Sequence, residues 1–145
     1  MTTIAWDGRT LAADRARVNG RGTVQACLKI FDCGAYVYGG TGDFVDLTVI
    51  CRWLRAGAKW KDRPAVTEGN GGLVVRKKDG VLFILDGNPA TLCEVPRGFT
   101  AAGSGSPYAL AAMECGRTAR QAVEVAMKFD DGTALGVDSF VVVPR

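Results

Sequence analysis

The chain has 145 residues, a formal net charge of +3 and 23% charged side chains, an ordinary composition for one globular domain. No apolar run approaches the roughly 20 residues of a membrane-spanning helix, and a net charge of +3 is too small to indicate a nucleic-acid partner. The sequence contains no histidine. Serine–histidine and cysteine–histidine catalysis are therefore excluded, and the base of any acyl-transfer reaction must be an amine or a carboxylate.

Thr2 directly follows Met1, so removal of Met1 would leave one domain over residues 2–145 with an N-terminal threonine. Such a residue has a hydroxyl nucleophile and a free α-amine. Because an α-amino group has a reference pKa of roughly 7.7–8, part of it is neutral at pH 7. The amine can then act as the base for its own hydroxyl. We therefore expect Met1 to be removed and no longer propeptide to exist.

The five cysteines are scattered and include no C-x-x-C pair. Without histidine or paired spacing they do not indicate a zinc site, so we expect no metal and no cofactor. We expect these cysteines to be buried free thiols in a reducing cytoplasm. Charged residues such as Asp7, Arg9 and Asp14 interrupt the start where a signal peptide needs an apolar run.

The first part of the chain is predicted to contain hairpins and one helix. Residues 2–6 and 9–13 are strand-like runs joined by Asp7-Gly8, the signal for a two-residue type I′ turn. A second strand pair is predicted at 24–31 and 35–38. A glycine turn over 39–42 then leads into a helix over about 43–56. Its apolar stripe consists of Leu47, Ile50, Cys51 and Leu54, with Asp46, Arg52 and Arg55 on other faces.

The middle of the chain is predicted to be loop and strand. Residues 57–72 contain Pro64 and a run of glycine and asparagine, which indicates a loop. Residues 73–76 and 81–85 are predicted to form a hairpin, and a short strand is predicted near 91–94.

Two helices and a strand are predicted to end the chain. Ser106 as cap and Pro107 at the first helical position indicate a helix that Gly116 ends. Thr118 and Gln121 fit a capping box. We expect this second helix to bury Ala122, Val125, Ala126 and Phe129. A closing strand is predicted at 140–143.

The order of elements is β-rich, one helix, β-rich, two helices and β. Consecutive strands joined by hairpins form antiparallel sheets, and three amphipathic helices must cover the outer faces of those sheets. The sequence therefore predicts an α+β fold, a four-layer α/β/β/α sandwich of two antiparallel sheets.

Six short segments, spread over the whole chain, follow one another in a recognisable order. They are Thr2-Thr3-Ile4, Asp14-Arg15, Lys29-Ile30-Phe31, the glycine turn 39–43, the segment 103–108 (Gly-Ser-Gly-Ser-Pro-Tyr), and Asp130 with Thr133. This pattern resembles the proteasome β-subunit and its bacterial HslV-type relative, the N-terminal threonine hydrolases (Ntn hydrolases). The late Asp130/Thr133 pair is more similar to the proteasome type than to HslV.

The resemblance implies a role for each matching residue. Thr2 would be the nucleophile, and Lys29 would keep the nearby amine neutral by charge repulsion. Asp14 would hold Lys29 charged and in place. The backbone N–H of Gly39 would stabilise the oxyanion. Ser104, Asp130 and Thr133 would form a hydrogen-bonded shell around the amine.

The chain departs from the family at residues 57–72, where the family has a second long helix. That helix contributes to subunit packing, so the resemblance implies a compact form whose ring size, or ring closure, stays open. We expect a homo-oligomer packed through helices at 107–115 and 118–129, with peptide or unfolded protein as substrate. An ATP-dependent unfoldase is a further partner that the resemblance implies.

The function predicted is a threonine-type endopeptidase, an amidohydrolase that cleaves peptide bonds. One alternative is an Ntn-type amidase that acts on a small amide. The other is a catalytically idle structural homologue that keeps the fold. Retention of Met1 would identify the idle homologue, because a blocked Thr2 has no free amine.

Overall fold

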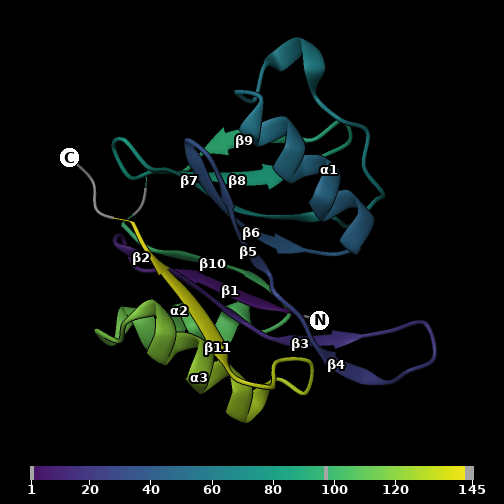
Figure 1. Ribbon diagram of the computed structural model, residues 1–145. Coiled ribbons are helices and arrows are strands. Elements are labelled where there is room, and N and C mark those ends of the chain that lie inside the picture. The colour runs from purple at the N-terminus through teal and green to yellow at the C-terminus, as the bar shows by residue number, and fades with distance from the viewer. Residues whose placement is uncertain (1, 97, 143–145) are drawn as a thin grey trace.

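The computed structural model describes residues 2–96 and 98–142, which form two antiparallel sheets with helices on their outer faces (Figure 1). The four-stranded sheet has the order β10-β1-β2-β11. Its strands are β1 (Thr3–Trp6), β2 (Thr10–Asp14), β10 (Thr100–Gly103) and β11 (Val137–Val141). The five-stranded sheet runs in sequence order from β5 to β9. Its strands are β5 (Ile30–Cys33), β6 (Tyr36–Thr41), β7 (Gly71–Arg76), β8 (Val81–Asp86) and β9 (Thr91–Glu94).

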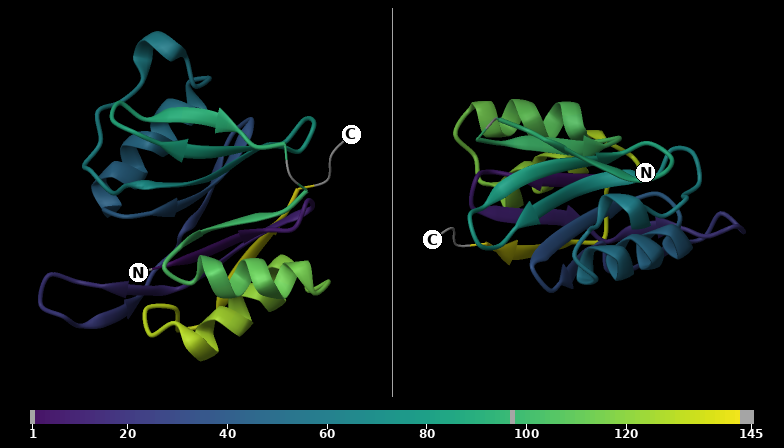
Figure 2. Two further views of the ribbon diagram at one scale, coloured as in Figure 1. Left: turned by 180° about the vertical axis from the view of Figure 1, so that it is seen from behind. Right: turned by 90° about the horizontal axis from the view of Figure 1, so that it is seen from above.

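Helices cover both outer faces, as the two views of Figure 2 show. Helix α1 (Phe44–Arg55) packs on the five-stranded sheet, whereas α2 (Ser106–Glu114) and α3 (Ala119–Phe129) pack on the four-stranded sheet. A third apolar cluster, which includes Ile4, Leu11 and Leu73, fills the space between the sheets. The predicted four-layer α/β/β/α sandwich is therefore confirmed.

The small hairpin of β3 (Ala16–Val18) and β4 (Val24–Ala26) projects from this body (Figure 1). The predicted continuous strand over 24–31 is wrong, because residues 24–26 pair with β3 whereas β5 begins at Ile30. Lys29 lies in the connection between these two pairings. The change of partner is a tertiary effect that a local apolar pattern does not record.

The first hairpin turn is shifted by one residue from the predicted Asp7-Gly8 turn. Trp6 pairs with Leu11, and the Asp7 N–H donates to the Thr10 carbonyl at 3.3 Å, so Gly8 and Arg9 are the turn residues. The Asp7 carboxylate accepts hydrogen bonds from the main-chain N–H groups of Arg9 and Thr10 at 2.9 and 2.8 Å. Its other oxygen accepts the N–H of Ala119 at the start of α3, at 2.8 Å. The carboxylate therefore stabilises the shifted turn and connects it to the helix layer.

The helix predictions are confirmed in position and corrected in detail. The stripe of α1 (Leu47, Ile50, Cys51 and Leu54) is buried, and Thr118 and Gln121 form the capping box. Asp46, however, is also buried, and the N-cap of α2 is Gly105, without a side-chain hydrogen bond, instead of Ser106. Phe129 is 63% exposed and stacks on Tyr108 with ring centroids 5.6 Å apart, so its predicted burial is wrong.

The remaining strands follow the sequence prediction with small shifts. The 73–76/81–85 hairpin and the strand at 91–94 are present, while β10 was not predicted. The closing strand begins at Val137, and Val143 lies outside the described residues. Residues 57–70 form a loop with a 3-10 turn at Trp60–Asp62, and Gly71–Gly72 already belong to β7.

The prediction of buried thiols holds for only part of the cysteines. Cys33 and Cys51 are buried, but Cys93 and Cys115 are exposed. Burial raises the pKa of the Cys33 thiol well above its usual range. In residues 2–96 and 98–142, no helix is long and apolar enough to cross a membrane.

Candidate active site

Three of the predicted residues, Thr2, Asp14 and Lys29, lie in direct contact. Thr2 precedes β1, Asp14 ends the neighbouring β2, and Lys29 enters from just before β5. Lys29 Nζ donates to Thr2 Oγ1 at 3.0 Å and to Asp14 Oδ1 at 2.9 Å. All three are buried, with exposed fractions of 6%, 0% and 4% in sequence order. The ammonium therefore lies between the hydroxyl and the carboxylate in a site largely protected from water.

Asp14 is held by the main chain as well as by Lys29. Its Oδ1 also accepts the N–H of Thr3 at 3.0 Å, and its Oδ2 accepts the N–H groups of Ala16 and Ala134 at 3.1 and 3.2 Å. A carboxylate without solvent exposure requires such partners, because an unpaired buried charge is strongly unfavourable. These bonds fix the carboxylate, and the carboxylate in turn fixes the Lys29 ammonium.

The other three predicted side chains, Ser104, Asp130 and Thr133, form a hydrogen-bonded group beside the Thr2 main-chain nitrogen. That nitrogen donates to Ser104 Oγ at 3.3 Å, and Ser104 Oγ donates to Asp130 Oδ2 at 2.8 Å. Thr133 Oγ1 donates to the same carboxylate oxygen at 2.5 Å. Since the single hydroxyl proton of Thr133 is used there, the Thr3 hydroxyl, 2.6 Å away, donates to Thr133.

The charge of Asp130 is favoured by this group. Partial burial alone would raise the pKa of Asp130, but the hydrogen bonds from Thr133 and Ser104 outweigh it and lower that pKa below its usual value. The carboxylate is therefore ionised at neutral pH and accepts from both hydroxyls.

Two glycines allow the Ser104 turn to pack against the start of β1. A side chain on Gly103 would place its Cβ 2.0 Å from the Thr2 carbonyl oxygen, and the residue has a φ of +92°. A Cβ on Gly105 would lie 1.9 Å from Thr3 Oγ1. Any larger residue at either position would push Ser104 away from Thr2.

Gly39 lies in β6, paired with Ile30 of β5 and Leu73 of β7. Its missing side chain leaves room for Ile4, which a Cβ would approach to 2.7 Å. The next residue, Gly40, lines the cavity beside Thr2 and donates its N–H to the Lys29 carbonyl at 2.9 Å. The predicted oxyanion segment therefore borders the site, with Gly40 as the residue that faces the cavity.

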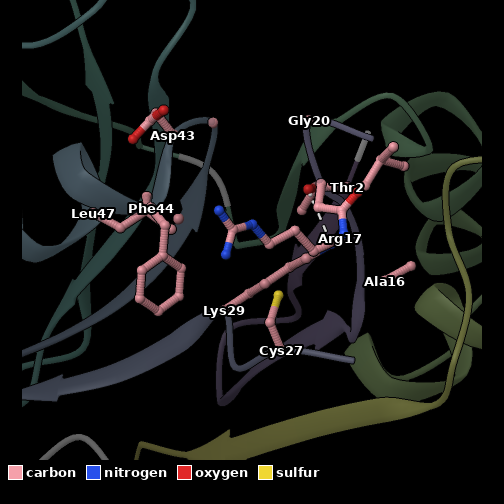
Figure 3. A pocket seen from close by; sticks show the side chains of 13 residues that line it. Thr2, Ala16, Arg17, Gly20, Cys27, Lys29, Asp43, Phe44 and Leu47 are labelled. Atoms are coloured by element: carbon pink, nitrogen blue, oxygen red, sulfur yellow. Dashed lines mark hydrogen bonds between the residues drawn. The ribbon is translucent and has the colours of Figure 1, made fainter. Parts of the chain in front are cut away.

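A cavity of about 370 Å³ opens beside Thr2 (Figure 3). It lies between the β3–β4 hairpin on one side and the first turn of α1 on the other. Its lining includes Arg17, Cys27, Phe44 and Leu47, which are not among the predicted site residues. The only sequence signal for them is proximity in the chain to Asp14, Lys29 and the 39–42 turn.

A buried polar network supports the α1 side of the cavity. Asn70 Oδ1 accepts the N–H of Asp43 at 2.5 Å, and its amide nitrogen donates to Asp46 and to the Thr67 carbonyl. Asp46 also accepts the N–H of Thr67 at 2.7 Å. Residues of the 57–70 loop thus fix the turn that enters α1. In the described part of the chain, no three histidine, cysteine, aspartate or glutamate side chains gather closely enough to hold a metal ion.

The sequence matches no protein-family model and no curated protein. Solved structures do match it. BPH of Thiobacillus denitrificans has a TM-score of 0.70 and 25% identity, with 99% of each chain covered, both alone and in its complex with epoxomicin. Eukaryotic HslV from Trypanosoma brucei has a TM-score of 0.66 and 19% identity, with 97% of each chain covered. The chain therefore has the Ntn fold of HslV- and proteasome-like proteins over nearly its whole length.

Proposed function

We propose that this chain is a proteasome-like threonine endopeptidase in which Thr2, freed by removal of Met1, is the nucleophile. The observation that carries the proposal is the pair of contacts made by Lys29 Nζ, 3.0 Å from Thr2 Oγ1 and 2.9 Å from Asp14 Oδ1. A buried ammonium that donates to a hydroxyl favours the charge that this hydroxyl develops as it loses its proton.

In the proposed reaction the Thr2 α-amine takes the proton from Oγ1 as Oγ1 attacks the carbonyl carbon of the substrate. The amine then returns that proton to the leaving nitrogen, which departs as a free amine and leaves an ester on Thr2. A water molecule, activated by the same amine, hydrolyses the ester. Gly39 N–H remains the proposed oxyanion donor, within the glycine segment that borders the cavity.

Lys29 and the Ser104 group have complementary roles in this proposal. The positive charge of Lys29 opposes a second positive charge on the amine and so keeps it a base near pH 7. Ser104 donates its proton to Asp130 and therefore presents a lone pair to an N–H of Thr2. This contact fixes the direction of the remaining lone pair on the amine. Thr133 holds the Asp130 carboxylate in place for that purpose.

The proposal also covers substrate, assembly and compartment. Epoxomicin in the BPH complex supports a site that accepts a peptide-like molecule. We propose that the chain acts on peptides or unfolded proteins in the cytoplasm, as a homo-oligomer, with an unfoldase as a further partner. The exposed Tyr108–Phe129 stack on α2 and α3 supports packing against another copy.

Two measurements on the purified protein test the proposal. Intact mass should give the chain without Met1, and retention of methionine in active protein would contradict the mechanism. The same preparation should cleave a fluorogenic peptide, with Thr2→Ala inactive and Thr2→Ser partly active because serine keeps both the oxygen and the amine. Turnover of a small amide but of no peptide would identify the amidase instead.

A further inference from the structure

The cavity beside Thr2 contains a cation that the proposed reaction does not use. Arg17 lies in β3, three residues after Asp14, and its side chain reaches across the cavity (Figure 3). The guanidinium carbon lies 5.1 Å from the centroid of the Phe44 ring at the start of α1. A stacked guanidinium keeps its edge free for hydrogen bonds. Arg17 is exposed, and its guanidinium contacts the ring while its donors face the cavity (Figure 3).

The guanidinium of Arg17 makes no hydrogen bond and no ion pair with any described residue. Some arginines of the chain have such partners: Arg15 pairs with Asp138, Arg76 pairs with Asp79, and Arg55 donates to the Asp32 carbonyl. Arg17 differs from these three because its planar group contacts the Phe44 ring alone and lines the cavity beside Thr2.

The other charges that line the cavity are already compensated. Lys29 is paired with Asp14 below Thr2. Asp43 accepts the N–H of Val45 at 2.8 Å and lies at the N-terminus of α1, where the helix dipole favours its negative charge. The uncompensated charge that an incoming group meets is therefore the Arg17 guanidinium.

The rest of the lining suits the stem of a short acidic side chain. Cys27, Phe44 and Leu47 also line the cavity and provide its apolar surface (Figure 3). A guanidinium binds a carboxylate through two parallel hydrogen bonds, which a neutral amide of the same shape cannot reproduce. Because Thr2 lines the same cavity, a side chain that enters it belongs to a residue next to the bond under attack.

We propose that Arg17 makes the site selective for glutamate or aspartate at the residue whose carbonyl Thr2 attacks. This inference rests on the proposed function, since it names the substrate class of the same site. Arg17 is a specificity-determining residue here and takes no part in bond breaking.

Binding to the Thr2→Ala protein tests recognition without any turnover. Two fluorescently labelled tripeptides are compared, one ending in glutamate amide and one in glutamine amide. They differ only in that a charged carboxylate oxygen of glutamate is replaced by a neutral NH2 group in glutamine. The glutamate peptide should bind at least ~10-fold more tightly, the lower end for a hydrogen bond to a charged group. Adding Arg17→Met should reduce this ratio to about one. Adding Arg21→Met, an equal loss of charge at the exposed tip of the same hairpin, should leave it unchanged.

The wild-type protein tests turnover separately with acetyl-tripeptide coumarylamides, which have no residue on the leaving side. Cleavage should be at least ~10-fold faster after glutamate than after glutamine, by kcat/KM. Cleavage without an acidic preference would overturn this inference and leave the proposed function intact. A binding preference without cleavage would support the inference and overturn the function. Equal effects of Arg17→Met and Arg21→Met would overturn the inference, because general charge attraction would then explain the preference.

Discussion

The Lys29 ammonium lies 3.0 Å from the Thr2 hydroxyl although the two residues are 27 positions apart in sequence. The contact depends on the change of strand partner between β4 and β5, which turns the chain so that Lys29 points toward the start of β1. In the proposed mechanism this contact places the Lys29 charge beside the Thr2 hydroxyl, where it also keeps the Thr2 α-amine neutral.

Replacement of Lys29 by alanine should lower kcat/KM for a peptide substrate at least ~10²-fold, the low end for general acid–base effects. The folded protein should persist, because Asp14 keeps three main-chain hydrogen-bond donors. Circular dichroism verifies folding, and Lys128→Ala on α3 is the control for loss of a surface lysine. Wild-type turnover in Lys29→Ala would show that Lys29 does not act on Thr2.

Replacement of Asp14 by asparagine should destabilise the fold itself. The amide loses one acceptor oxygen and leaves the Lys29 ammonium buried without its counter-charge. We expect the free energy of unfolding to fall by about 3 kcal/mol, as for other buried ion pairs with one partner removed. Urea denaturation measures this value, with Asp138→Asn at a partly exposed pair as the control. A loss no larger than that of the control would mean that Asp14 is not held as described.

Replacement of Asp130 by asparagine should reduce stability in a pH-dependent manner. The pKa of this carboxyl is lowered in the folded protein, so the stability that its charge contributes is present above the ordinary aspartate value. That contribution is lost as the pH falls through the lower, folded value. The difference in Tm between wild type and Asp130→Asn should therefore be constant from pH 7 to 5 and shrink below about pH 4. A difference that grows on acidification would contradict the hydrogen bonds assigned to Asp130.

Replacement of Asn70 by alanine should weaken substrate binding, although Asn70 is not one of the proposed catalytic residues. The change removes the acceptor for the Asp43 N–H and a donor to Asp46, both at the turn that borders the cavity. We expect a loss of about 1–3 kcal/mol in stability, the usual cost of unsatisfied buried polar groups. KM should rise more than kcat falls. Asn88→Ala, which removes one bond to Val66 away from the cavity, should change stability alone.

The sequence predicted those parts of the site whose neighbours in the chain determine them. Thr2 at the start, Asp14 at a strand end and Ser104 in a glycine turn are each marked by local features of the sequence. The order of these features along the chain gave the resemblance to the family. Arg17 and Asp46 were missed, because the sequence pattern placed Asp46 on an outer face and gave no reason to direct Arg17 toward a cavity. Asp46 is buried where Thr67 and Asn70 of the 57–70 loop donate to its carboxylate.

The difference between local features and contacts of distant residues also explains which parts of the fold could be predicted. Helix boundaries follow from caps such as Asp43 and Thr118, which act within one turn. The strand β10 and the exposure of Phe129 depend on partners far away in the chain, so period and composition could not reveal them.

Labelling by epoxomicin tests most directly whether Thr2 is the nucleophile. A peptide epoxyketone requires both the hydroxyl and the free α-amine of an N-terminal threonine for a stable adduct. The methionine-free protein should take up one molecule per chain, mapped to the tryptic peptide 2–9, and folded Thr2→Ala should take up none. An adduct on Ser104 or on a cysteine, or no adduct on folded, methionine-free protein, would contradict the proposed function.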